Sequence, residues 1–218
     1  MRSSSRLAAL EAVAVYLLIV VYIWWLRFPV PASWIAIWAL ILASHVWRKE
    51  TPVTLGLGAA NLESGLAAIG PWLAALALLL VAAGLVLHTL RGISWTSGML
   101  SLLRYCVWGL FQQYLLNGYF VNRFLAWMPA GRVPLAAALV FAGAHLPNAF
   151  LMTATFLGGY ACAKLYLKYR NLYLLGLAHA TVGFLLYLVV PDSVSHHLYV
   201  GPKWFAFDFD PHGAVSCQ

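Results

Sequence analysis

Residues 7–26 read LAALEAVAVYLLIVVYIWWL, an apolar run in which Glu11 is the one charged residue. A helix needs about 20 such residues to cross the hydrocarbon core of a bilayer. The run is too long for the apolar part of a signal peptide, and no small-residue cleavage site follows it. It therefore predicts a helix that crosses a membrane and is retained in the protein.

The whole chain has the composition of a protein that crosses a membrane several times. Its 218 residues are 63% hydrophobic and 9% charged, with a mean hydropathy of +0.84. A soluble domain of this size needs much less apolar surface. The 10 Trp and 11 Tyr fit aromatic belts at the two membrane interfaces. The net charge of +7 fits cytoplasmic loops, so we expect no nucleic-acid partner.

Hydropathy extends this prediction along the chain to an all-α, polytopic transmembrane helix bundle of about seven spans. The fourth span is long enough to be bent or broken, and Pro147 marks the turn between the fifth and sixth. We expect residues 1–98 to hold N-terminal helices and a cytoplasmic loop, 99–190 the core helices, and 191–218 an extracytoplasmic aromatic tail. The predicted spans are 7–26, 31–46, 68–90, 99–128, 133–146, 152–168 and 172–190.

The distribution of basic residues predicts the orientation of the chain. With the N-terminus inside, nine basic residues fall on the cytoplasmic side and three outside, which agrees with the positive-inside rule. The C-terminal tail then lies outside. The cytoplasmic set is Arg2, Arg6, Arg48, Lys49, Arg123, Arg132, Lys164, Lys168 and Arg170, and the outer set is Arg27, Arg91 and Lys203.

The tail contains an aromatic, partly alternating run, WFAFDFD, at residues 204–210. Alternation favours a strand, whereas the aromatic content favours a cap that lies on the membrane surface. An exposed apolar run of this kind is also suited to contact another subunit. All three readings remain open from the sequence.

Five polar residues lie deep in the predicted spans. Gln112, Gln113 and Asn117 belong to the fourth span, His145 to the fifth and His179 to the seventh. Helix rise places Gln113, His179 and His145 about 9, 10 and 18 Å from the inner face of a ~30 Å hydrocarbon core. These depths predict that the groups can meet. They act either as hydrogen-bonding contacts between helices or as a functional site.

The acidic residues lie elsewhere. Glu50 and Glu63 are expected in the loop after the second span, Glu11 lies one turn into the first helix, within reach of the interface, and the three Asp are in the tail. His45 and His88 lie near span ends, at the expected membrane interface. The deep polar set therefore contains no carboxylate.

Three short motifs carry these polar residues in order along the chain. Residues 112–118 read QQYLLNG, residues 141–145 read FAGAH, and residues 179–183 read HATVG. At these positions the chain resembles the CPBP family, the CAAX-protease and bacteriocin-processing membrane proteins. That family is characterised by a Glu-Glu-x-x-x-Arg helix, then Phe-x-x-x-His, then His-x-x-x-Asn. The resemblance is strongest over residues 110–185 and implies a polytopic helical fold and an intramembrane endopeptidase activity.

The chain departs from the family pattern at four positions. Gln112 and Gln113 replace the two glutamates, Asn117 replaces the arginine, and Gly183 replaces the final asparagine. In the family the glutamate is thought to activate water, with the histidines in an oxyanion or metal role. A glutamine has no proton-accepting state near neutral pH, so it can only position water or donate hydrogen bonds. The substitutions together indicate a site without formal charges. Loss of the arginine accompanies loss of the glutamates because an arginine without its carboxylates would be an unpaired buried charge.

Histidine remains as the possible base of such a site. His145 or His179 can take this role, with Gln113 holding a water or an oxyanion and with Gln112 beside it. The resemblance adds Phe141, Asn117 and Gly183 as supporting residues. Weaker candidates are Cys106, seven residues before Gln113 and thus on the same helix face, and three tyrosines: Tyr105, Tyr114 and Tyr119.

No cofactor is expected, and two neutral histidines with an amide are a poor ligand set for zinc. A weakly bound divalent metal at His145 and His179 stays open. Cys106, Cys162 and Cys217 are dispersed, without CxxC spacing, which argues against a zinc ribbon and a disulfide framework.

Two functions follow as hypotheses. The first is an intramembrane hydrolase that cleaves a membrane-anchored peptide or lipidated substrate at His145, His179, Gln112 and Gln113. The second is a catalytically inactive member that holds a lipid, a peptide or another membrane subunit. The resemblance favours the first, and the missing carboxylates favour the second. In both cases membrane lipids are partners, and we expect an integral protein of a bacterial inner membrane.

Overall fold

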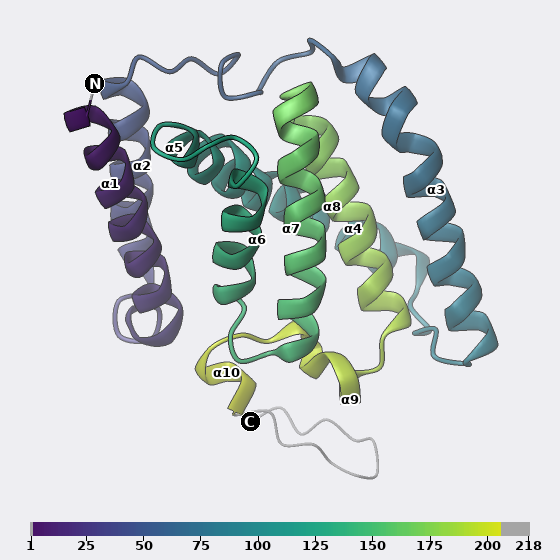
Figure 1. Cartoon of the computed structure of the whole chain (residues 1–218). Helices are drawn as coiled ribbons and strands as arrows, with labels where there is room; N and C mark the ends of the chain where they lie inside the picture. Colours follow the sequence, from purple (N-terminus) through teal and green to yellow (C-terminus); the bar gives the residue numbers. More distant parts are fainter. Residues whose placement is uncertain (1, 206–218) are drawn as a thin grey trace.

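The computed structural model describes residues 2–205, and every regular element in this range is helical (Figure 1). Four helical stretches are long and apolar enough to cross a membrane, and two shorter apolar helices accompany them. The predicted polytopic helix bundle is confirmed. The four are Ser5–Leu26, Leu62–Val86, Ala149–Tyr169 and Leu172–Val189, and the shorter two are Pro31–Trp47 and Val133–Gly143.

All seven apolar runs in the sequence form helices. The first hairpin consists of α1 Arg2–Val21, its continuation η1 Tyr22–Leu26, the short turn η2 Pro31–Ser33, and α2 Trp34–Trp47. The fourth run is one long helical segment in three parts. The remaining elements are α3 Leu62–Val86, α4 Trp95–Gln113, η3 Tyr114–Val121, α5 Asn122–Leu125, α6 Val133–Gly143, α7 Ala149–Tyr169, α8 Leu172–Val189, α9 Asp192–Ser195, η4 His196–Leu198 and α10 Pro202–Phe205.

One boundary differs enough to move a charged residue. The third span was expected at residues 68–90, whereas α3 is Leu62–Val86. Glu63 therefore lies in the first turn of α3 and not in the preceding loop. A carboxylate is favourable there because the N-terminus of a helix carries partial positive charge. The polar residues before the apolar run concealed this start in the hydropathy pattern.

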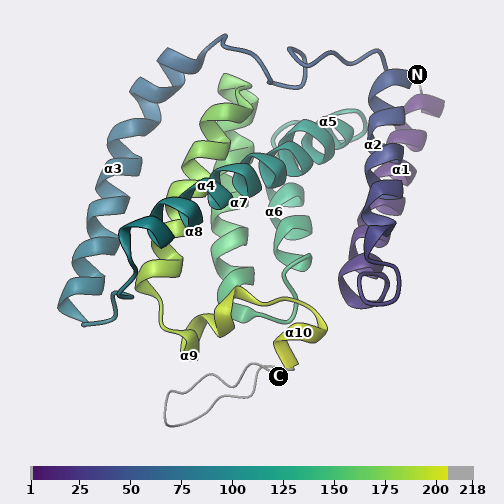
Figure 2. The ribbon, with the colours of Figure 1, turned by 180° about the vertical axis from the view of Figure 1, so that it is seen from behind.

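The segment α4–η3–α5 crosses the other core helices. Seen from behind, α4 runs at a steep angle across α8, α7 and α6, and its continuation ends beside the α1–α2 hairpin (Figure 2). The helix changes from α to π geometry at Tyr114, directly after Gln113. π-Helical turns are rare and occur frequently at functional sites. The α1–α2 hairpin lies on one flank of the core and α3 on the other (Figure 1).

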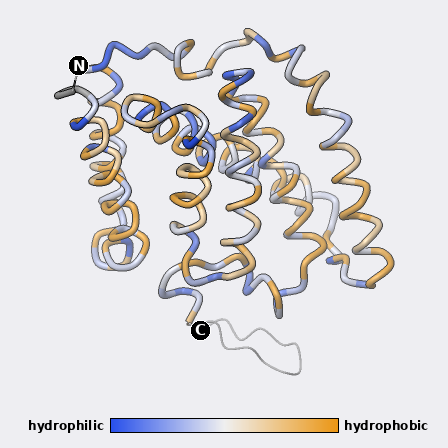
Figure 3. Tube along the Cα trace, viewed as in Figure 1, coloured by the Kyte–Doolittle hydropathy of each residue, from blue (hydrophilic) through white to orange (hydrophobic). Residues whose placement is uncertain are grey.

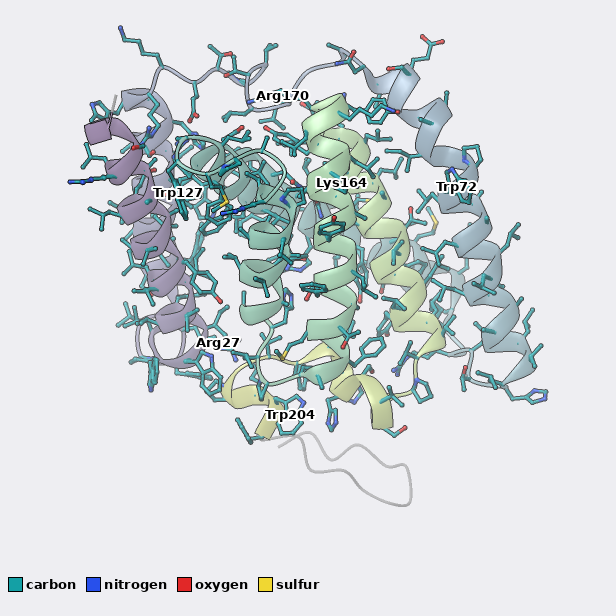
Figure 4. All side chains as sticks on the ribbon, viewed as in Figure 1. Arg27, Trp72, Trp127, Lys164, Arg170 and Trp204 are labelled. Carbon is teal, nitrogen blue, oxygen red and sulfur yellow. The ribbon has the colours of Figure 1, made fainter. Side chains whose placement is uncertain are left out.

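The two ends of the bundle carry different ionic contacts. Apolar residues follow the helices, and hydrophilic residues gather at the end where the N-terminus lies (Figure 3). Arg170 lies at that end, and Arg27 lies at the opposite end with Trp204 (Figure 4). The Arg91 guanidinium forms a two-pronged ion pair with Asp192, which ties the loop before α4 to α9.

Arg123 is the centre of a buried ionic network at the N-terminal end. Its side chain is 1% exposed and contacts the carboxylate of Glu11 through Nε at 2.7 Å. Nη1 and Nη2 donate to the two carboxylate oxygens of Glu50, both at 2.8 Å. Nη2 also donates to Ser44 at 2.8 Å. Glu11 accepts a further bond from Arg48 at 2.7 Å. The network joins α1, α2 and the loop after α2 to α5.

The sequence placed His45 and Glu11 at the membrane interface, whereas in the structure both side chains form hydrogen bonds within the protein. His45 is 4% exposed, and its Nδ1 lies 2.6 Å from a carboxylate oxygen of Glu50. Tyr119 donates its hydroxyl to Glu11 at 3.0 Å. These bonds satisfy charges that would otherwise be costly to bury.

Glu50 gives this network a predicted acid sensitivity. Burial alone raises the pKa of Glu50, but the hydrogen bonds from His45 and Arg123 outweigh it and lower the pKa from 4.5 to about 2. A carboxyl group whose pKa is lowered in the folded state stabilises the protein above its unfolded pKa of 4.5, and this stabilisation is lost as the pH falls towards 2. For Glu50 the contribution to the free energy of unfolding is about 3 kcal/mol. We expect thermal denaturation in detergent to show this loss between pH 5 and pH 2. A Glu50→Gln variant with the same acid dependence as the wild type would contradict it.

The chain after α8 folds back over the end opposite the N-terminus. The Gly201 backbone N–H donates to the Leu146 carbonyl at 2.8 Å, and Arg27 donates to the Val200 carbonyl at 3.0 Å. Phe205 packs on Trp24 with ring centroids 6.5 Å apart. Trp204 and Phe205 belong to α10, so of the three readings left open by the sequence the strand is excluded for these two residues. The rest of the aromatic run, 206–210, lies outside the described residues.

Candidate functional site

Gln113, Asn117 and His179 form a chain of hydrogen bonds at the crossing of α4 and α8. Gln113 is the last residue of α4, and Asn117 lies one turn later; both are 0% exposed. The Asn117 amide donates to Gln113 Oε1 at 2.6 Å, and Gln113 Nε2 lies 3.0 Å from Nδ1 of His179. The predicted site residues of the fourth and seventh spans are thus brought together.

The orientation of the Gln113 amide determines where His179 carries its proton. With Nε2 towards the ring, Gln113 donates, so His179 Nδ1 accepts and the proton resides on Nε2. If both amides were flipped, Gln113 Nε2 would donate to Asn117 Oδ1. The NH₂ group of Asn117 would then lie where no partner is available. In the orientation found, the buried atom of these two amides that lacks a partner is the Asn117 carbonyl oxygen, Oδ1. Unpaired buried N–H groups are rarer than under-bonded carbonyls, so the orientation found is favoured.

His145 has the opposite arrangement. It follows the end of α6, and its Nδ1 lies 2.7 Å from the backbone carbonyl of Phe141. A carbonyl only accepts, so His145 carries its proton on Nδ1 and its Nε2 keeps a free lone pair. The Phe141 carbonyl is available because the backbone N–H of His145 bonds instead to Ala142 at 2.9 Å. The end of α6 therefore sets the tautomer of its own histidine.

The Phe141 ring lies against both histidines. Its centroid is 5.0 Å from that of His145, at 89°, and 6.1 Å from that of His179, at 54°. Phe141 is 9% exposed, so it supports both rings from the protein interior. His145 offers an acceptor nitrogen and His179 a donor nitrogen, and both rings contact this one phenylalanine.

Small residues bring α4 and α8 close enough for the contact between Gln113 and His179. A Cβ added to Gly109 would lie 2.9 Å from the Gly176 carbonyl oxygen and 3.3 Å from Cδ2 of His179. A Cβ added to Gly176 would lie 2.9 Å from Cα of Leu110. Close backbone approach through glycine is a common way to pack membrane helices. Gly183, two turns beyond Gly176, would meet the Tyr105 ring at 3.2 Å, so its role here is packing.

Gly176→Leu is therefore expected to separate the two helices. Extra methylenes in a close-packed contact cost about 1–3 kcal/mol, and the separation should also break the bond between Gln113 and His179. Thermal denaturation in detergent measures the first effect. The matched control is Gly158→Leu on α7, since a Cβ at Gly158 meets nothing within 4 Å. Equal stability of the two variants would contradict this role of the glycine.

Gln112 takes no part in the chain of hydrogen bonds described at Gln113. It is half-buried, and successive residues of a helix point about 100° apart. The glutamine pair therefore divides into one member within the site and one beside it. The tyrosine candidates also lie elsewhere: Tyr119 bonds Glu11, Tyr114 stacks on Trp38, and Tyr105 packs on Phe184.

Cys162 is the residue at this site that the sequence did not indicate. Its thiol on α7 is within hydrogen-bonding reach of the Gln113 side chain. Cys106, the cysteine considered from the sequence, is half-buried on α4. No motif or spacing distinguishes Cys162, so only the packing of α7 against η3 reveals it. Residues 2–205 contain no group of three or more His, Cys, Asp and Glu side chains that could hold a metal ion.

Comparison with known families adds an independent observation. Residues 94–185 match the model of a family described as type II CAAX prenyl endopeptidase Rce1-like. The chain carries an Rce1-like domain. This confirms the resemblance to the CPBP and CAAX-protease family. No curated protein and no solved structure matches the chain.

The Rce1-like domain extends from the start of α4 into α8 and covers less than half of the 218 residues. It contains all the site residues predicted from the sequence. It also contains Arg123, whose partners Glu11 and Glu50 lie outside it. The protein is therefore a membrane protein with a CAAX-protease-like core, and the α1–α2 hairpin is fixed to that core by buried charges.

Proposed function

We propose that the protein is an intramembrane endopeptidase with an altered active site, in which histidine replaces glutamate as the base. The observation that carries this proposal is the pair of opposite histidine tautomers. The bond to Phe141 leaves His145 with an accepting Nε2, and the bond from Gln113 leaves His179 with a donating Nε2–H. A hydrolytic site needs one of each.

The reaction follows from these roles. His145 Nε2 removes a proton from water as the water oxygen attacks the carbonyl carbon of the scissile amide. His179 Nε2–H donates to the oxyanion that forms, and Gln113 holds His179 in the donating tautomer. On collapse of the tetrahedral intermediate the C–N bond breaks, and the proton on His145 passes to the leaving amine. Atoms and charge balance without a carboxylate.

The substrate class follows from the family and from the membrane setting of the core. We propose a membrane-anchored or lipidated peptide, in a bacterial inner membrane, with the N-terminus of the protein in the cytoplasm. The nine-to-three excess of basic residues on the side of the N-terminus and Arg170 supports this orientation through the positive-inside rule.

A second candidate is a catalytically inactive member that binds a peptide, a lipid or another membrane subunit. The burial of Gln113 and Asn117, both 0% exposed, favours it. A side chain that water does not reach cannot position a reacting water directly. In this case the amide chain would serve only to hold α4 against α8.

Hydrolysis of membrane-anchored peptides by the purified protein in proteoliposomes distinguishes the two. The endopeptidase proposal predicts turnover that requires both His145 and His179 and persists in the presence of a chelator. Absence of turnover, or turnover insensitive to both histidines, would overturn the assigned site. The inactive alternative predicts no turnover and a stoichiometric peptide or membrane subunit retained in mild detergent. If turnover appears only after Gln112→Glu and Gln113→Glu are introduced together, the fold still supports catalysis but the wild-type protein is inactive. That result would favour the alternative.

A further inference from the structure

A lateral groove of about 520 Å³ lies between α1 and α2, on the hairpin that forms one flank of the bundle (Figure 1). It is separate from the histidine site. The lining from Leu7 to Ala14 extends about 10 Å along α1, and the walls are mainly apolar. The lining residues are Leu7, Leu10, Glu11 and Ala14 from α1, and Leu40, Ala43, Ser44 and Trp47 from α2.

Two polar side chains interrupt the apolar lining, and both are already bonded. Glu11 accepts from Arg48, Tyr119 and Arg123, and Ser44 donates to Glu11. The Glu11 carboxylate is therefore compensated from within the protein. The groove has no unpaired negative charge in its described lining that would select a cation.

The open end of the groove is basic. Leu7 and Trp47 line the same end because α1 and α2 are antiparallel, and this end carries the hydrophilic residues near the N-terminus (Figure 3). Arg6 adjoins Leu7 and is exposed, and Arg48 and Lys49 directly follow Trp47. The Arg48 guanidinium lies 5.5 Å from the Trp47 ring centroid. Tryptophan beside cationic residues is typical of the headgroup level of a membrane.

We propose that this groove binds one anionic phospholipid, with an acyl chain along α1 and α2 and its phosphate at Arg6 and Arg48. Charge complementarity commits the occupant to an anionic lipid, since the apolar groove ends beside the exposed Arg6 and Lys49 and beside Arg48. Arg48 pairs with Glu11 through Nε and Nη2, which leaves its Nη1 to contact a phosphate. Basic clusters next to membrane helices attract anionic headgroups for the same reason. The bound lipid would contact Glu11, which lines the groove. Glu11 pairs with Arg123, so the lipid would lie next to the ion pair that attaches the hairpin to the core.

Native mass spectrometry of the full chain in detergent tests this proposal, with phosphatidylglycerol and phosphatidylcholine as the two added lipids. The wild type is expected to retain one phosphatidylglycerol in preference to phosphatidylcholine. Ala43→Phe fills the groove and should abolish this retention. Its matched control is Ala74→Phe on the exposed face of α3, which should leave it unchanged. Arg6→Gln should weaken retention about fivefold, as expected for one cation at an anionic surface, whereas Arg132→Gln should not.

Several outcomes would overturn the proposal. The first is equal retention of the two lipids, and the second is retention unaffected by Ala43→Phe. The third is binding of glycerol phosphate as tightly as the lipid, which would indicate a phosphate site that does not use the groove for an acyl chain. A dimer that Ala43→Phe dissociates would show that the face holds a second copy instead. Peptide turnover enters none of these measurements, so the result is independent of the proposed endopeptidase activity. Unchanged melting temperatures identify the variants that remain folded.

Discussion

His145→Ala is expected to lower turnover of a membrane-anchored peptide by a factor of about 10²–10⁴, the usual contribution of a general base. The Phe141 carbonyl fixes the ring so that Nε2 is the accepting nitrogen. Alanine removes the base without burying a new polar group. Steady-state kinetics in proteoliposomes measure the loss, which should appear in kcat with little change in KM.

His179 gives a distinguishable result. His179→Ala removes a donor to the oxyanion, which costs about 10²–10³ in kcat. Gln113→Leu should reproduce part of this loss by releasing the tautomer of His179, and it should leave the role of His145 unaffected. If His145→Ala keeps more than a tenth of wild-type kcat while His179→Ala abolishes it, the two roles are assigned the wrong way round.

Arg123→Met is expected to destabilise the protein by about 3–5 kcal/mol, because it leaves the carboxylates of Glu11 and Glu50 without their buried partner. Methionine fills much of the same volume, so the loss reports the uncompensated charge and not a cavity. Thermal or chemical denaturation in detergent measures it. Arg132→Gln at an exposed position is the control for loss of a positive charge alone.

A compensating variant shows whether charge is the cause. Glu11 keeps its ion pair with Arg48 in the Arg123→Met variant, whereas Glu50 loses its guanidinium partner. Adding Glu50→Gln to Arg123→Met should therefore restore part of the lost stability. If the double variant is as unstable as the single one, then packing around Arg123, and not its ion pair with Glu50, attaches the hairpin to the core.

The spans and the meeting of Gln113 with His179 were accessible from the sequence for simple physical reasons. Apolar runs long enough to span a bilayer have few alternatives to a helix. Depth along a helix then follows from the rise per residue, which placed Gln113 and His179 at similar levels. The contact between them is mediated by Gly109 and Gly176, which the motifs did not identify.

The ionic network was not accessible in the same way. Glu11 and Arg123 are far apart in the chain. The hydropathy pattern placed each near the end of a predicted span, at the membrane boundary, and gave no indication that they meet. Their contact depends on how the hairpin packs beside α5, which no local pattern encodes. Cys162 and the π-helix after Gln113 were missed for the same reason, because both depend on how η3 packs against its neighbours.

The most direct test of the account is the tautomeric state of the two histidines, measured by ¹⁵N NMR of histidine-labelled protein in nanodiscs. Difference spectra with His145→Gln and His179→Gln assign the signals. We expect a proton on Nδ1 of His145 and on Nε2 of His179 at neutral pH. The same tautomer at both positions, or the reverse arrangement, would contradict the pairing of a base with a donor on which the proposed chemistry rests.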